Sequence, residues 1–348
     1  YAFIGFLEAE GWKYSSGNNI SRVTKRDVLI SGDFRKFIAD TNPDLTEDEV
    51  TQIFDNVRLV GSESDFATLH KVYGWMVDGV QFTPQDGLAR MIPLIDFKNW
   101  DKNIFRVVNQ FTVEYTNNGQ KENRRPDVLL FVNGMPLCVI ELKNPADANA
   151  TIYDAWEQIN IRYWRDIPHL LHYCPLACIS DGVKTRLGTV RTPYEHFYAW
   201  RRVNDGDTVS TLPFEETETM IKGVYAPERF LEIFRDYIYF QDSIYDSDEV
   251  EIVCRYPQFF AARLLKQSII NSVVQKSGKG GTYFGATGCG KTYTMAFLAR
   301  QLALRCTDIP EIGSPTIILI VDRDELQKQG AKLFTKSKEF LNLGEVSV

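Results

Sequence analysis

Three side chains between residues 127 and 143 are of the types that a metal-dependent nuclease needs. Asp127 follows Pro126, and after a spacer of thirteen residues comes Glu141-Leu-Lys143. Two carboxylates can hold Mg²⁺ against a phosphodiester, where the metal polarises the phosphate and lowers the pKa of an attacking water. A nearby lysine can stabilise the developing negative charge. We therefore predict that Asp127 and Glu141 bind Mg²⁺ and that Lys143 assists phosphodiester hydrolysis.

The run that carries Glu141 and Lys143 is otherwise apolar. Side chains two apart on a strand share one face of a sheet, so these two charges would lie together. A solvated strand pair is the plainer interpretation of an isolated Glu-x-Lys, but charges in a strand that is apolar on both faces are unfavourable without a role. A two-residue loop at Asn133-Gly134 with regular pairing would set Asp127 across from Ile140, on the wrong face. We therefore predict a loop of odd length or a β-bulge.

Three more polar residues are candidates for the same site. Gln158 and Tyr163 lie on a helix predicted over Ile152 to Trp164, from which they could orient a DNA phosphate or the metal. A surface glutamine and a half-buried tyrosine are the alternative interpretation. Glu8 could supply another metal ligand, although a solvated helix face, shared with Glu10, explains it more simply.

Residues 285–292 match the phosphate-binding pattern G-x4-G-K-[ST] in full. In such a loop the glycines let backbone N–H groups surround a phosphate, the lysine reaches the β- and γ-phosphates, and the threonine hydroxyl ligates Mg²⁺. A short strand at Thr282–Phe284 is expected before the loop, and a helix after it. The residues predicted to bind ATP here are Gly285, Thr287, Gly288, Cys289, Gly290, Lys291 and Thr292, with Thr292 also on the Mg²⁺ of ATP.

Two motifs flank the phosphate loop. Gln258 lies 33 residues before the loop lysine, where superfamily 2 helicases often place a glutamine that reads adenine. The apolar run Thr316 to Val321 ends at Asp322, which is also the shape of a Walker B strand. Arg323 follows where a helicase has Glu, so we interpret this segment as an early DNA-contacting motif. On this interpretation the catalytic Asp-Glu box and the second motor lobe lie beyond Val348.

Composition limits the class of protein. A chain of 348 residues exceeds the usual size of one hydrophobic core, and we predict domains over residues 1–245 and 246–348, with the boundary in an acidic stretch near residue 245. The longest purely apolar run, Ile317 to Val321, is too short to span a membrane.

Six scattered cysteines without zinc-like spacing indicate buried thiols in a reducing compartment, so we expect the cytoplasm. The net charge of -7 predicts that DNA contacts are local or shared with partner subunits.

Periodicity and turn signals predict an α/β protein whose first 85 residues are mainly helical. Helices are expected at Phe3 to Leu7, Asp33 to Ala39, Glu47 to Val57 (capped by Thr46), Ile152 to Trp164, Ala226 to Phe240, Phe259 to Val274 and Thr292 to Arg305. Strands are expected at Phe105 to Val108, Phe111 to Tyr115, Asp127 to Val132, Leu137 to Lys143, Leu176 to Ser180 and Thr316 to Val321.

The order of these motifs resembles the R subunits of type I restriction enzymes. The resemblance rests on Arg125-Pro-Asp127, Gly134 to Pro145, Arg165 to Pro168, Ile179 to Gly182, Gly188-Thr189, the phosphate loop and Asp322-Arg323, and it extends from about Glu8 to Gln329. It implies a PD-(D/E)xK endonuclease fold, which is a mixed sheet flanked by helices, followed by the first of two RecA-like helicase lobes. It also implies Mg²⁺ and ATP as cofactors. The implied partners are double-stranded DNA, which the enzyme pumps toward itself and cuts, and the methyltransferase and specificity subunits.

The resemblance assigns roles by position. Asp127 and Glu141 would be metal ligands, Lys143 the catalytic lysine, and Gln158 with Tyr163 the family's Gln-x3-Tyr element. One departure is that Gln158 and Tyr163 stand one residue too far apart, while Tyr163 keeps its distance to the Ile-Pro that follows. Two other functions remain open: a stand-alone ATP-dependent helicase–nuclease of DNA repair, and a DNA-clamping scaffold with a decayed site, against which the intact acidic residues and lysine speak.

Overall fold

The computed structural model describes residues 2–61, 63–85, 87–144, 151–209, 212, 215–241 and 249–320. The chain forms two compact units, Tyr1–Leu231 and Glu232–Val348. Among the described residues, no helix is both long and apolar enough to cross a membrane.

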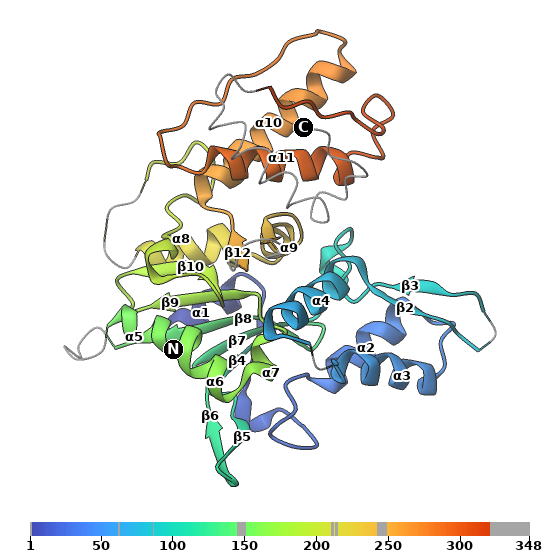
Figure 1. The fold of residues 1–348 in the computed structure, drawn as a ribbon, viewed down its shortest axis with the longest axis vertical. Coiled ribbons are helices and arrows are strands. Elements are labelled where there is room, and N and C mark those ends of the chain that lie inside the picture. Colours follow the sequence, from blue (N-terminus) through green and yellow to red (C-terminus); the bar gives the residue numbers. More distant parts are fainter. Residues whose placement is uncertain are drawn as a thin grey trace. The chain divides into compact units, whose positions relative to one another are not determined.

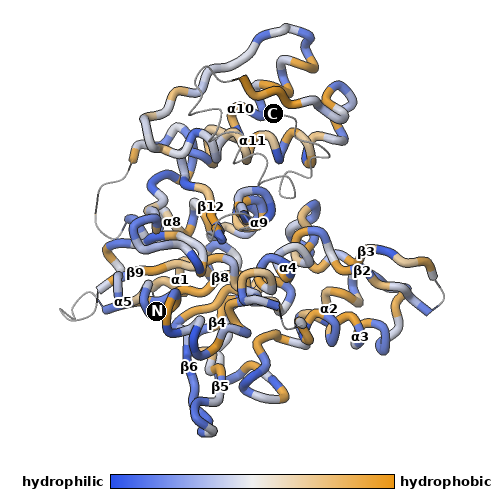
Figure 2. The backbone as a smooth tube through the Cα atoms, viewed as in Figure 1, coloured by the Kyte–Doolittle hydropathy of each residue, from blue (hydrophilic) through white to orange (hydrophobic). Residues whose placement is uncertain are grey.

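A mixed six-stranded sheet forms the core of the first unit, in the order β1-β4-β7-β8-β9-β10 (Figure 1). The strands are β1 (Lys13–Ser16), β4 (Phe105–Asn109), β7 (Val128–Val132), β8 (Met135–Leu142), β9 (Leu176–Ser180) and β10 (Thr185–Thr189). The β1/β4 and β8/β9 pairs are parallel, and the other pairs are antiparallel. Every residue of β7 and β9 is buried, which explains the apolar runs in the sequence and the hydrophobic middle of the sheet in Figure 2.

Helices cover both faces of this sheet. In Figure 1, α5 (Ile152–Glu157), α6 (Trp164–Asp166) and α7 (Pro168–Leu171) lie in front of the sheet, and α1 (Ala2–Ala9) lies behind it. The residue Trp12, just after α1, fixes the rear layer: its indole N–H donates to the Tyr225 carbonyl at 2.7 Å, and its ring packs edge-on against Phe105 and Phe230. The fold is therefore α/β, with a mixed sheet flanked by helices. Other helical segments of this unit are η1 (Gly17–Asn19), η2 (Trp100–Lys102), η4 (Tyr194–His196), α8 (Glu215–Met220), the π-helix η5 (Ile221–Tyr225) and the first part of α9 (Pro227–Asp236).

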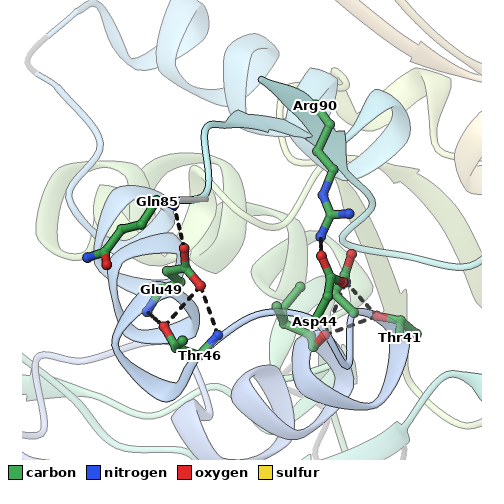
Figure 3. Close-up of polar contacts among 8 residues, drawn as sticks. Thr41, Asp44, Thr46, Glu49, Gln85 and Arg90 are labelled. Atoms are coloured by element: carbon green, nitrogen blue, oxygen red, sulfur yellow. Dashed lines mark hydrogen bonds and ion pairs between the residues drawn. The ribbon is translucent and has the colours of Figure 1, made fainter. Parts of the chain in front are cut away.

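A helical insert separates β1 from β4. It comprises α2 (Ser31–Thr41), α3 (Glu47–Arg58), α4 (Asp65–Asp78), β2 (Val80–Phe82) and β3 (Arg90–Ile92). The predicted cap of α3 is confirmed, because Thr46 and Glu49 form a capping box, and Glu49 also accepts the Gln85 backbone N–H at 2.8 Å (Figure 3). These hydrogen bonds, first that from the Thr46 backbone, hold the pKa of the Glu49 carboxyl below its ordinary value. Arg90 ties the β2–β3 ribbon to Asp44 at 2.5 Å (Figure 3).

A polar hairpin of β5 (Val113–Asn117) and β6 (Gln120–Arg124) joins β4 to β7. Its turn residues Asn118 and Gly119 both have positive φ, as a two-residue type I′ turn requires. The strand β6 was not predicted from the sequence, because Gln120–Arg124 has no apolar alternation.

The second unit contains β11 (Ile238–Gln241), β12 (Val250–Val253), α10 (Tyr256–Val274) and α11 (Lys291–Arg305). The helix predicted to end at Phe240 ends at Asp236, because the aromatic and β-branched residues that follow favour a strand and pair with β12. The strands predicted at residues 282–284 and 316–320 are wrong, and Val321 lies outside the described residues. A strand needs a hydrogen-bonded neighbour, and the strands described in this unit pair only with each other.

Candidate active site

The β7–β8 hairpin sets the register of the two acidic residues. Asn133 and Gly134 form a two-residue loop with φ of 50° and 78°, so Val132 pairs with Met135. The register then shifts between Leu130 and Phe131, so that Leu130 pairs with Cys138 and Val128 pairs with Ile140. The predicted β-bulge is confirmed, and the shifted register brings Asp127 opposite Glu141.

The Asp127 and Glu141 carboxylates each accept a hydrogen bond from the backbone of the segment that carries the other. The Asp127 backbone N–H donates to Glu141 Oε1 at 3.4 Å, and the Leu142 backbone N–H donates to Asp127 Oδ2 at 2.9 Å. Glu141 is fully buried, whereas Asp127 is partly exposed. Both carboxylates therefore meet at one end of the sheet, where Asp127 opens the site to solvent.

Lys143, Gln158 and Tyr163 complete a hydrogen-bonded cluster around Glu141. Lys143 Nζ donates to Gln158 Oε1 at 2.8 Å, and Gln158 Nε2 donates to Glu141 Oε2 at 2.8 Å. The Tyr163 hydroxyl donates to Glu141 Oε1 at 2.6 Å and accepts from Gln158 Nε2 at 2.8 Å. The structure thus brings together five of the six residues that the sequence singled out for this site, and we name them the acidic cluster: Asp127, Glu141, Lys143, Gln158 and Tyr163.

A π-helix explains the irregular spacing of Gln158 and Tyr163. The segment η3 (Gln158–Tyr163) has the wider π turn, between α5 and α6. In a π-helix the repeating hydrogen bond joins residues five apart, so Gln158 and Tyr163 lie on the same face, as residues four apart do in an α-helix. The extra residue therefore does not remove Gln158 from the cluster.

Burial and charge act together on Glu141. The pKa of its carboxyl is raised well above the ordinary value, first by burial and then by the charge of Asp127, while the Tyr163 hydrogen bond opposes the rise. Burial, followed by the charge of Glu141, also raises the pKa of Tyr163, so this hydroxyl stays protonated and remains a hydrogen-bond donor. A cation close to both carboxylates would favour their charged forms.

The cluster has the donor chemistry of a magnesium site. Among the described residues, no group of three or more His, Cys, Asp or Glu side chains gathers around one point. Mg²⁺ is usually bound through one or two carboxylates, with waters and substrate phosphates completing its shell. Asp127 and Glu141 therefore fit a magnesium ion held jointly with a phosphate.

Gln110 supports Asp127 and was missed in the sequence. It follows β4 with a positive φ of 53°, its backbone N–H donates to the Asp127 carbonyl at 3.0 Å, and its Nε2 donates to Asp127 Oδ1 at 3.3 Å. A single glutamine after a strand carries no signal of this role.

Glu8 is exposed on α1, and none of the hydrogen bonds or ion pairs described for the chain joins it to the acidic cluster.

The phosphate loop lies before α11, which starts at Lys291. Gly288 and Gly290 have positive φ, as the turn into the helix requires. Lys291 Nζ donates to the carbonyls of Gly285 and Ala286 at 2.8 and 2.9 Å, so the lysine lies across the loop. Thr292 follows on the first turn of α11, and Cys289 is half-buried.

Gln258 contacts this loop from α10. Its side-chain Nε2 donates to the carbonyls of Gly290 at 3.2 Å and Cys289 at 3.4 Å, while its Oε1 accepts the Arg255 backbone N–H. The structure thus places Gln258 beside the loop, and its reading of adenine stays a prediction. Asp322 and Arg323 lie outside the described residues.

Residues 2–196 match the family model described as type I restriction enzyme R protein N terminus, which covers more than half of the chain. The chain belongs to the type I restriction enzyme R protein family. Residues 257–345 match the model of the SWI2/SNF2 ATPase, so the part of this R protein that holds the phosphate loop is similar to an ATPase.

Named relatives agree with this family. The chain is 29% identical over 352 residues to the type I restriction enzyme HindI endonuclease subunit of Haemophilus influenzae, covering 96% of this chain and 32% of that protein. It is 28% identical over 363 residues to a Methanocaldococcus jannaschii protein named for the endonuclease subunit of type I restriction enzyme MjaIXP, covering 96% and 33%. A Staphylococcus aureus relative, the SauCOLORF180P endonuclease subunit, is 27% identical over 248 residues, which are 70% of this chain and 24% of that protein. The chain therefore spans about a third of the length of the first two relatives.

Proposed function

We propose that this R protein cleaves double-stranded DNA with Mg²⁺ and that cleavage is coupled to ATP-driven DNA translocation. The endonuclease part is assigned to residues 1–245, with a PD-(D/E)xK fold, and the first RecA-like motor lobe to residues 246–348. The observation that carries this proposal is the acidic cluster, which lies within the residues that match the R protein N terminus.

Each residue of the acidic cluster has a task in this reaction. Asp127 and Glu141 would hold the magnesium ion, which supplies Lewis-acid activation of the phosphate and of the attacking water. Lys143 lies just past the end of β8, two residues beyond Glu141, and would stabilise the charge that develops on the phosphate. Gln158 fixes the distance between the lysine and Glu141, because its amide bonds to both side chains. Tyr163 holds the other Glu141 oxygen through a hydroxyl that stays protonated.

The phosphate loop would supply the motor. Lys291 now bonds to loop carbonyls and would exchange them for the β- and γ-phosphates of ATP, while Thr292 would bind the accompanying Mg²⁺. Gly285, Thr287, Gly288, Cys289 and Gly290 would surround the phosphates, and Gln258 holds the end of this loop from α10. The proposed partners are methyltransferase and specificity subunits; a stand-alone repair helicase–nuclease would purify without them.

Alanine substitution of the acidic cluster tests the nuclease assignment. In the R protein assembled with its partner subunits, Asp127→Ala, Glu141→Ala and Lys143→Ala should each abolish Mg²⁺-dependent cleavage while DNA binding stays near normal. Asp101→Ala, which removes an exposed carboxylate elsewhere in the first unit, is the matched control and should cut normally. Undiminished cleavage by any two of the three cluster variants would refute the assignment.

A further inference from the structure

The sheet register extends the face of the acidic cluster toward β10. Glu141 pairs with Ile179 on β9, and Ile179 pairs with Arg186 on β10. Directly paired residues point to the same face of a sheet, so Arg186 lies on the same face as Glu141. The two residues are two strand spacings apart, or about 10 Å.

Arg186 belongs to a group of cations that we name the basic shelf: Lys184, Arg186 and Arg201. Together with Phe197, Tyr198, Ala199 and Glu216, they line a hollow of about 370 Å³ beside β10. Lys184 and Arg201 are exposed, Arg186 is half-buried, and the ion pairs described for the chain include none of the three. The shelf therefore presents three cations that form no ion pair within the described part of the chain, and Glu216 is the carboxylate among the residues that line the same hollow.

The two carboxylates near the shelf accept hydrogen bonds from backbone N–H groups. Glu216 Oε1 accepts the Thr185 backbone N–H at 2.7 Å. Asp181 Oδ1 accepts the backbone N–H groups of Val183 and Lys184 at 2.9 and 2.7 Å. These hydrogen bonds hold the bonded carboxylate oxygens on the backbone of residues 183–185, and neither carboxylate forms an ion pair with a shelf cation among the described residues.

An aromatic group continues the shelf toward the helix that covers the acidic cluster. The Arg186 guanidinium lies 5.9 Å from the centre of the Tyr194 ring, and Tyr194 packs edge-on against Tyr153 of α5. Tyr153 is 47% exposed, so a polar aromatic surface lies between the shelf and α5. Tyr153 belongs to α5, which packs on β8, the strand that carries Glu141, and on β9, the strand that lies between β8 and β10.

We propose that the basic shelf binds the sugar–phosphate backbone of double-stranded DNA beside the bond that the acidic cluster cleaves. The inference rests on the proposed nuclease function and adds the position of the bound DNA. A distance of about 10 Å corresponds to roughly three nucleotide steps along the axis of one strand of B-DNA, so the shelf would hold phosphates next to the reacting one. In a chain of net charge -7, three cations and one carboxylate around this hollow make a local excess of positive charge, which favours contact with DNA phosphates.

The salt dependence of DNA binding tests the shelf. Each phosphate contact contributes about 0.9 to the slope of log K against log salt, so Lys184→Gln/Arg186→Gln/Arg201→Gln should reduce the slope by up to about 2.7. Affinity of the purified 348-residue chain for a DNA duplex is measured by fluorescence anisotropy without Mg²⁺. Each single glutamine variant should reduce the slope by about 0.9, and Arg186→Lys, which keeps the charge, should retain it.

A matched charge change separates the shelf from the chain's overall charge. Lys13→Gln/Lys98→Gln/Lys102→Gln removes three exposed lysines elsewhere and should leave the slope nearly unchanged. Equal slopes for the shelf variants and this control would overturn the proposal. This measurement needs no cleavage, so its outcome is separate from the nuclease test. If the cluster variants lose cleavage while the shelf variants keep the salt slope, the proposed DNA contact of the shelf is wrong and the nuclease assignment stands.

Discussion

The acidic cluster and the phosphate loop differ in what holds their functional groups. In the cluster, Lys143 and Glu141 are joined through Gln158, so the chain itself supplies the partners of both charges. In the loop, Lys291 lies across the carbonyls that precede it, where it occupies the region that the phosphates of ATP would enter. The side chains of the acidic cluster are therefore already bonded to one another, whereas Lys291 would have to leave its present partners to contact a phosphate.

The two sites also differ in how deeply the elements that carry them are buried. The cluster stands on a sheet whose middle strands are fully buried between helices. In the second unit the described strands form only the β11–β12 pair, and Phe284 and Ile320 are 93% and 88% exposed. These two side chains therefore add little buried apolar area to the second unit.

The largest effect that separates the two sites is expected from Lys291→Ala in the full-length R protein. In the proposed function this change removes the charge that would stabilise the γ-phosphate in the transition state, so ATP hydrolysis should fall by roughly 10²–10³-fold or more. Translocation, followed as displacement of a triplex probe, should stop with it. If cutting requires the motor, cleavage should also disappear although the acidic cluster is intact.

A substitution in the acidic cluster is the control for this coupling. Glu141→Ala deletes a proposed metal ligand in the other unit, and ATP hydrolysis and triplex displacement should continue at near normal rates. Efficient cleavage by the Lys291 variant would mean that the nuclease does not depend on the motor.

A smaller effect is expected from Gln158→Ala. This change leaves the proposed metal ligands in place but breaks the link between Lys143 and Glu141, and loss of such a supporting hydrogen bond typically lowers metal affinity or activity about 10–100-fold. Cleavage measured against Mg²⁺ concentration should therefore show a higher requirement for the metal. Ile161→Ala, on the same π-helix but 48% exposed, should cut normally. A Gln158 variant with an unchanged Mg²⁺ requirement would argue against the positioning role.

The smallest effect is a dependence of stability on pH. Because the pKa of Glu141 is raised on folding, its contribution to stability is fully present below the unfolded value, about 4.3, and is lost as pH rises through the folded pKa. Thermal melts in EDTA should therefore show Tm falling over this window, and Glu141→Gln should weaken the fall. Glu195→Gln, at an exposed acid, is the matched control. Parallel pH profiles for the wild-type and Glu141→Gln chains would contradict this account.

The sequence predicted the parts of the first unit in which hydrophobic pattern and function agree. Apolar runs located β7, β8 and β9, and the need to bring Asp127 to the face of Glu141 predicted a bulge that the register shows. The strand β10 was missed, because Thr185–Thr189 mixes polar residues with a glycine and has no clear alternation. Gln110 was missed because its hydrogen bonds to Asp127 depend on a positive φ, which a glutamine in the sequence does not indicate.

In the second unit, local pattern was a poorer guide. The helices α10 and α11 lie where periodicity placed them, because the backbone hydrogen bonds of a helix join residues that are close in sequence. Residues 282–284 and 316–320 are apolar in sequence but not strands in the structure, because a strand depends on a neighbour that local sequence cannot supply.

The π-helix η3 has an evolutionary consequence. One residue added to an α-helix would rotate everything beyond it by about 100°, a full residue step of a helix with 3.6 residues per turn. The wide turn at residues 158–163 absorbs such an addition locally, so the side chains before and after it keep their neighbours. A single-codon insertion or deletion in this segment is therefore a change that the R protein lineage could accept without dismantling the acidic cluster.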